Sequence, residues 1–148
     1  FLTHRDHIMT FHEKSAWLMG LLLTVIGGWY INTVWDISRE TGVTAPPMLA
    51  LVALATIALI AGAVVSHIII AVADPEGAEG QEDERDKQVL RRAGNISGYV
   101  LGFGCFAGLW HFFWNQDGNL LFHIIVASLI ASQIAEYALT ILFYRRGH

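Results

Sequence analysis

The chain has 148 residues, of which 54% are hydrophobic and 15% are charged, and its mean hydropathy is +0.47. A charged fraction this far below the roughly 25% of soluble domains argues against a soluble enzyme, and the length fits one domain. The net charge of −4 offers no overall positive field of the kind that holds nucleic acid. The single cysteine, Cys105, excludes an intrachain disulfide and a cysteine-rich zinc site.

Four stretches of the chain carry almost no charge, and each contains the roughly 20 residues that a helix needs to cross the hydrocarbon core of a bilayer. Lipid offers no hydrogen-bond partner to the backbone, so each stretch should be helical. We expect spans near residues 15–35, 47–73, 94–115 and 119–144. The sequence therefore predicts an all-α membrane protein, a four-helix transmembrane bundle that forms a single domain over residues 1–148.

The first span differs from a cleaved signal peptide. Its apolar run is long, and Trp29, Tyr30 and Trp35 close it where a signal peptide has small residues. We expect this span to remain in the mature protein. The segment that begins at Met9 resembles a natural N-terminus, which places residues 1–8 upstream of the natural start.

The connections between the spans have distinct compositions. Pro46 and Pro47 suit the start of the second span, and the short sequence 115–119 predicts a tight turn between two antiparallel helices. The loop 74–93 is acidic at first and then basic. Its glycine and acidic content predicts disorder over 74–82, whereas the helix-forming residues from Asp83 onward predict a helix that leads into the third span.

The basic residues are distributed unequally between the two sides of the predicted bundle. Cytoplasmic loops of membrane proteins are enriched in Lys and Arg. All but Arg39 fall on the side that carries both termini and the loop 74–93. We therefore expect both termini to face the cytoplasm, in a multi-pass protein of the bacterial inner membrane. The residues on this side are Arg5, Lys14, Arg85, Lys87, Arg91, Arg92, Arg145 and Arg146.

Glu136 interrupts the fourth span. A central carboxylate costs roughly 2.5–3.5 kcal/mol on insertion scales, so it should face protein or water. Helical spacing places Ser132 on its face and Gln133 beside it. Glu136 either holds helices together by hydrogen bonds or forms the site of a small dimeric proton- or cation-coupled transporter. His67, predicted nearer the same side of the membrane, is a candidate to pair with it and handle protons.

Two further histidines occupy the predicted spans. His111 and His123 lie near the adjoining ends of the third and fourth spans and should share a depth. Two imidazoles at one depth suggest either the axial ligands of a haem or part of a metal site. The alternative is a pair of interfacial histidines hydrogen-bonded to backbone or lipid headgroups. Apart from this candidate site we predict no cofactor.

Glycines in the third span follow the spacing at which small residues let helix backbones approach in a bilayer. Gly94, Gly98 and Gly102 form one such row, and Gly104 and Gly108 form another. The pattern predicts where helices pack, and it does not identify a ligand.

The most motif-like segments are charged and lie at the ends of the predicted spans. Asp83, Glu84, Arg85 and Asp86 precede the third span, followed by Arg91-Arg92-Ala93-Gly94 and Gly98-Tyr99. Together with residues 12–16 and 144–147, they resemble a family of small bacterial four-span inner-membrane proteins. Some members of that family are associated with small helix-turn-helix regulators. The resemblance implies the topology and the inner membrane and no particular activity.

The sequence lacks a phosphate-binding glycine loop and a Ser–His–acid grouping, so we expect a non-enzymatic protein. Our preferred interpretation is a regulatory or accessory membrane subunit. Its expected partners are membrane lipid, a second copy or a larger membrane complex, and a cytoplasmic regulator. The transporter built on Glu136 and the haem or metal protein built on His111 and His123 remain as alternatives. The expected docking residues are Asp83, Glu84, Arg85, Asp86, Arg91 and Arg92.

Overall fold

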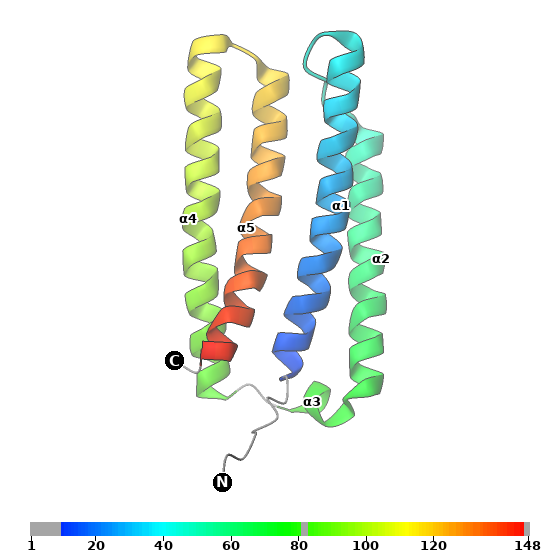
Figure 1. The fold of residues 1–148 in the computed structure, drawn as a ribbon, viewed down its shortest axis with the longest axis vertical. Coiled ribbons are helices and arrows are strands. Elements are labelled where there is room, and N and C mark those ends of the chain that lie inside the picture. Colours follow the sequence, from blue (N-terminus) through cyan, green and yellow to red (C-terminus); the bar gives the residue numbers. More distant parts are fainter. Residues whose placement is uncertain (1–9, 81–82, 147–148) are drawn as a thin grey trace.

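The computed structural model describes residues 10–80 and 83–146, and these residues are almost entirely helical (Figure 1). Four of the helices are long and apolar enough to cross a membrane, which confirms the predicted fold class. The prediction that residues 1–8 precede the natural start lies outside the described residues. The five helices are α1 (Phe11–Thr41), α2 (Leu49–Ala73), α3 (Pro75–Glu79), α4 (Glu84–Asn115) and α5 (Gly118–Arg146).

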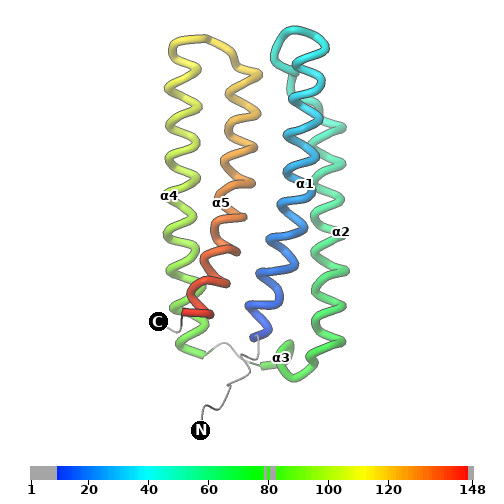
Figure 2. Tube along the Cα trace, viewed as in Figure 1, coloured from blue at the N-terminus to red at the C-terminus, as the bar shows by residue number. Residues whose placement is uncertain are grey.

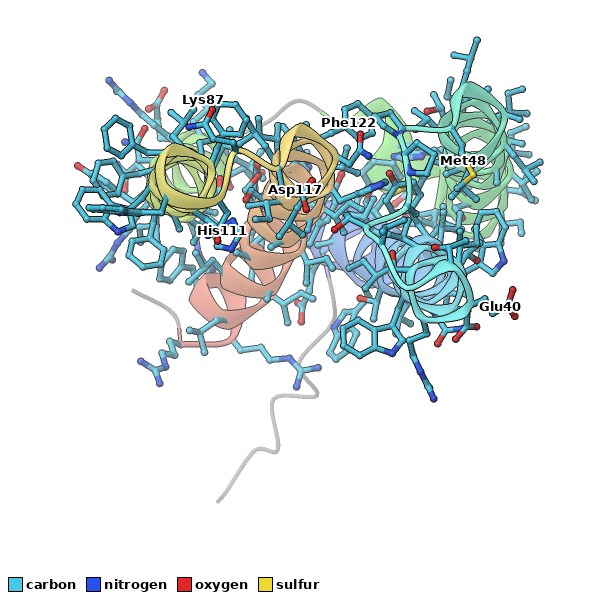
Figure 3. The ribbon with its side chains drawn as sticks, turned by 90° about the horizontal axis from the view of Figure 1, so that it is seen from above. Glu40, Met48, Lys87, His111, Asp117 and Phe122 are labelled. Atoms are coloured by element: carbon cyan, nitrogen blue, oxygen red, sulfur yellow. The ribbon has the colours of Figure 1, made fainter. Side chains whose placement is uncertain are left out.

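The long helices α4, α5, α1 and α2 stand side by side in that order (Figures 1 and 2). Substantial packing joins α4 to α5, α5 to α1, and α1 to α2. Viewed along the helices, α4 and α2 lie at opposite edges of the molecule (Figure 3). The bundle is therefore an open row, in which the two central helices, α1 and α5, each have a neighbour on both sides.

The two ends of the bundle differ in what they carry. One end, here the terminal end, contains the start of α1, the end of α5 and the short helix α3 (Figure 1). The opposite end, here the turn end, contains the connections 42–48 and 116–117. An even number of crossings places both ends of the described chain together, as the sequence predicts. The side of the membrane that each end faces stays a prediction.

Two helices extend beyond their predicted boundaries because polar caps stabilise additional turns. The Thr10 hydroxyl accepts a hydrogen bond from the Glu13 amide at 3.2 Å and starts α1. Asp83 and Asp86 form a capping box that starts α4, ahead of the predicted membrane span at residues 94–115. The predicted helix from Asp83 onward is confirmed, and it is continuous with the membrane-spanning part of α4.

The expectation of disorder over 74–82 is wrong for the described residues 74–80. Pro75–Glu79 forms α3, with Pro75 at a position that suits proline and Asp74 as its cap. The Asp74 carboxylate accepts a hydrogen bond from the Gly77 amide at 3.0 Å and pairs with Lys14 of α1 at 3.3 Å. The hydrogen bond from Gly77, followed by the contact with Lys14, holds the pKa of Asp74 below its ordinary value. Residues 81–82 lie outside the described part.

The second row of predicted small residues packs as expected. A Cβ placed on Gly104 would overlap the side chain of Ser128, and one on Gly108 would lie 2.8 Å from Ile124. These glycines therefore allow α4 to approach α5 closely. Gly98 and Gly102 behave differently, because a Cβ on either would meet nothing within 4 Å.

Candidate functional site at the charged end of the bundle

Charged segments that are far apart in the sequence meet at the terminal end. Glu13 of α1 is fully buried, and its Oε1 accepts a hydrogen bond from Nε of Arg145 at 3.2 Å. The Arg145 guanidinium also lies over the ring of Trp17, 5.5 Å from its centre. A buried carboxylate is stable only with compensating charge or hydrogen bonds, so this pair ties the start of α1 to the end of α5.

The beginning of α4 is fixed to the end of α5 by a second group of contacts. The hydroxyl of Tyr144, which is buried, donates a short hydrogen bond of 2.5 Å to the Asp86 carboxylate. The Arg85 guanidinium donates to the Tyr144 carbonyl oxygen at 3.3 Å. Asp83, Arg85 and Asp86 therefore serve the internal structure of the terminal end, since Asp83 and Asp86 also form the cap of α4.

The other predicted docking residues, Glu84, Arg91 and Arg92, are exposed. Glu84 and Lys87 form an ion pair of 3.4 Å with side chains 84% and 58% exposed. Arg91 is exposed one turn further along α4, and Lys87 lies at the margin of the molecule (Figure 3). Arg92 is also exposed, and its guanidinium lies 4.7 Å from the centre of the Phe143 ring. We name the exposed charged residues Glu84, Lys87 and Arg91 the α4 charged face.

Glu136 lies between α5 and α4 inside the apolar part of the bundle. Its Oε2 accepts hydrogen bonds from Ser97 at 3.5 Å and from Gln133 at 3.4 Å. Its Oε1 is the atom nearest to Gly94, since a Cβ there would lie 3.7 Å away. The observed contacts agree with the role of a hydrogen-bonded glutamate that links two helices. The nearby Ser132 is buried and donates to the Leu129 carbonyl oxygen.

The structure does not bring His67 to Glu136. His67 lies on α2, where Nδ1 is 2.7 Å from the Ala63 carbonyl oxygen and Nε2 is 3.1 Å from the Ser15 hydroxyl of α1. Because α1 and α5 stand between α2 and α4, the histidine contacts α1 while Glu136 contacts α4. The suggested His67–Glu136 proton pair is therefore wrong.

His123 is buried at the turn end and is hydrogen-bonded through both ring nitrogens. Nδ1 lies 2.9 Å from the Tyr30 hydroxyl, and Nε2 lies 2.8 Å from the carbonyl oxygen of Ala45. A carbonyl oxygen only accepts, so Nε2 carries a proton and donates to Ala45. In the tautomer that is protonated at Nε2, Nδ1 accepts from the Tyr30 hydroxyl. This arrangement joins α1, α5 and the connection 42–48. It leaves neither nitrogen free for an iron ion unless these bonds break.

His111 has different surroundings. Its Nε2 lies 3.1 Å from the side-chain amide of Asn115 on the same helix. It borders an open hollow on α4 with Phe106 and Trp110, whereas His123 borders a cavity of about 300 Å³ between α1 and α5. Within residues 10–80 and 83–146, no group of three or more His, Cys, Asp or Glu side chains is placed to hold a metal ion. A haem or metal site at His111 and His123 stays a prediction.

A further polar contact joins the two connections of the turn end. The Thr44 hydroxyl donates to Asp117 at 2.7 Å, and the Leu120 amide donates to the same carboxylate at 3.1 Å. These hydrogen bonds, that from Thr44 first, hold the pKa of Asp117 below its ordinary value. The contact links the α1–α2 connection to the start of α5 next to His123.

The sequence marks Tyr30 only as one of the aromatic residues that close the first span, and Tyr144 only as part of a charged C-terminal segment. It predicts neither as a site residue. Their hydroxyls contact groups 93 and 58 positions away in the chain, which no local pattern reveals. Comparison with protein families, with characterised proteins and with solved structures finds no match for this chain.

Proposed function

We propose that this chain is a non-enzymatic accessory or regulatory protein of the bacterial inner membrane, with its terminal end in the cytoplasm. The excess of Lys and Arg at that end supports the orientation. The charged segments that resemble a family of small bacterial four-span proteins support the compartment. On this proposal, the α4 charged face binds a cytoplasmic partner or a soluble part of another membrane subunit.

The main support for this proposal is the length of α4 and the contacts that hold its first turns against α5. The helix has 32 residues and spans roughly 48 Å at 1.5 Å per residue, against roughly 30 Å of hydrocarbon. Its first turns, with Glu84, Lys87 and Arg91, therefore extend beyond the apolar core. Since Asp86 and Arg85 fix these turns to Tyr144, the exposed side chains are presented on a rigid element. A pre-ordered surface loses little conformational entropy when it binds a partner.

The test reverses the two basic charges of the α4 charged face and leaves the contacts of Arg85 and Asp86 with Tyr144 in place. The variant Lys87→Glu/Arg91→Glu should reduce recovery of a co-purifying partner at least tenfold, while membrane insertion and helix content stay unchanged. Arg39→Glu is the control, because Arg39 is an exposed basic residue at the turn end of α1. If the double variant retains the same partners as the wild type, the docking proposal is wrong.

A small dimeric proton- or cation-coupled transporter is the second candidate function. It is favoured by Glu136, a half-buried carboxylate deep in the bundle whose Oε1 takes no part in the two hydrogen bonds to Ser97 and Gln133. In liposomes with a pH-sensitive dye inside, the wild type should dissipate a pH gradient and Glu136→Gln should not. A wild type that gives no flux above empty liposomes, or flux unchanged by the substitution, would remove this candidate.

A further inference from the structure

Gln133 and Glu136 place polar atoms at the depth of the hydrocarbon core. Gln133 lies 12 positions before Arg145 and 16 after Asp117, which is roughly 18 Å and 24 Å along the helix. Its side chain is nevertheless exposed on the surface of the chain, and Glu136 is half-buried beside it. Amide and carboxyl groups facing lipid are costly, so such residues normally face protein or a water-filled cavity.

The chain itself satisfies these groups only in part. With the described residues, Gln133 makes one hydrogen bond, to Glu136, although its side chain has two N–H donors and an acceptor oxygen. Both hydrogen bonds to Glu136 are long, at 3.4 and 3.5 Å, and both end on Oε2. Among the described residues, no Lys or Arg forms an ion pair with Glu136. Donor and acceptor positions thus remain for a partner outside the chain.

The surface beside these side chains leaves room for such a partner. Gly94 adjoins Glu136 Oε1, and Gly98 lies one turn further along the same side of α4. No atom of residues 10–80 or 83–146 lies within 4 Å of a Cβ built on Gly98, so another backbone can approach there. Leu129, one turn from Gln133 on α5, is 48% exposed. We name these five residues (Gly94, Gly98, Leu129, Gln133 and Glu136) the Gln133 face.

We propose that the Gln133 face is the interface of a parallel homodimer. Two copies inserted in the same direction are related by a two-fold axis along the membrane normal, so residues near the axis face their own copies at the same depth. A glutamine amide both donates and accepts, so Gln133 is complementary to its own copy and can also donate to Oε1 of Glu136 in the second copy. The dimer therefore satisfies these polar atoms without a second kind of protein. This interface goes beyond the cytoplasmic docking function and does not depend on it.

Disulfide cross-linking tests the position of the interface in the full-length protein. In a Cys105→Ala background, Leu129→Cys keeps the polar side chains of the interface and should form a covalent dimer on oxidation in liposomes at a low ratio of protein to lipid. Ile57→Cys is the matched control. Ile57 is 63% exposed on α2. It lies at a depth similar to that of Leu129, because Gly62 of α2 packs on Leu22 of α1 and Gly20 of α1 packs on Tyr137 of α5. We expect at least fivefold more dimer from Leu129→Cys. Equal yields, or none from Leu129→Cys, would overturn the proposal.

The oligomeric mass tests the polar contacts themselves. The wild type and Glu136→Gln should be dimers by native mass spectrometry in mild detergent, because an amide oxygen at position 136 still accepts a hydrogen bond. Gln133→Leu/Glu136→Leu should weaken the dimer at least tenfold while circular dichroism shows unchanged helix content. A monomeric wild type, or a dimer that survives the double substitution, contradicts the proposal. If the double substitution lowers the helix content, Gln133→Leu alone replaces it, and this single substitution should also weaken the dimer.

Discussion

At the scale of single residues, the turn end depends on one buried imidazole. His123 accepts from Tyr30 and donates to Ala45, so one side chain joins two helices and a connection. These partners were not predictable from the sequence, because 93 and 78 positions separate the bonded residues. The position of His123 in the sequence is enough to predict that it lies near one end of the fourth span. Its hydrogen-bond partners can be predicted only when the neighbouring helices are known.

Loss of the Tyr30 hydroxyl should therefore destabilise the protein measurably. Tyr30→Phe leaves Nδ1 of a buried histidine without its donor, which costs about 1–3 kcal/mol. The free energy of unfolding in detergent, measured by denaturant titration, should fall by this amount. Tyr99→Phe is the control, because Tyr99 is 79% exposed on α4 and should change the value by less than about 0.5 kcal/mol. Equal effects of the two substitutions would contradict the assigned role of Tyr30.

Asp117 should make the stability of the turn end dependent on pH. Its pKa is lowered in the folded protein, chiefly by Thr44, so the unfolded chain binds a proton more readily. The stabilising contribution is thus complete above the ordinary pKa of 3.8 and is lost as the pH falls through the lower, folded-state value. Between about pH 5 and pH 3, the wild type should lose more stability than Asp117→Asn. Parallel pH profiles for the two proteins would refute this assignment.

At the scale of helices, hydropathy predicts the spans well and their ends poorly. The apolar part of each helix was evident because roughly 20 uncharged residues have few alternatives to a membrane helix. The beginning of α4 at Glu84 depends instead on the Asp83–Asp86 capping box and on Tyr144. Similarly, α3 forms because Asp74 caps it and Lys14 holds Asp74, a contact across 60 positions. Composition alone predicts disorder there.

The α4 cap provides a direct test of the rigid charged face. Asp83→Ala removes the hydrogen bond to the Asp86 amide and should cost about 0.5–2 kcal/mol of local helix stability. Hydrogen exchange over residues 84–90 should accelerate, by roughly tenfold for each 1.4 kcal/mol. Exchange in α2, which lies at the opposite edge, should not change. Glu84→Ala, which removes an exposed charge without a capping bond, is the matched control. Equal acceleration by both would contradict the capping role.

At the scale of the whole molecule, the order of the helices decides which predicted groups meet. The α4–α5–α1–α2 row brings Glu13 to Arg145 and Glu136 to Ser97, and it separates His67 from Glu136. Only the α4–α5 and α1–α2 adjacencies follow from short connections in the sequence. The adjacency of α1 and α5 arises from long-range packing such as that of Gly27 on Ile130, which hydropathy does not encode.

The proposed docking surface requires four membrane crossings with the terminal end in the cytoplasm, and the proposed dimer requires that every copy crosses the membrane in the same direction. In a Cys105→Ala background, an impermeant maleimide applied to intact cells should label Gln116→Cys at the turn end. It should label Arg146→Cys at the terminal end only after the membrane is permeabilised. Labelling of Arg146→Cys in intact cells, or of neither or both residues without permeabilisation, would contradict four crossings with the terminal end in the cytoplasm.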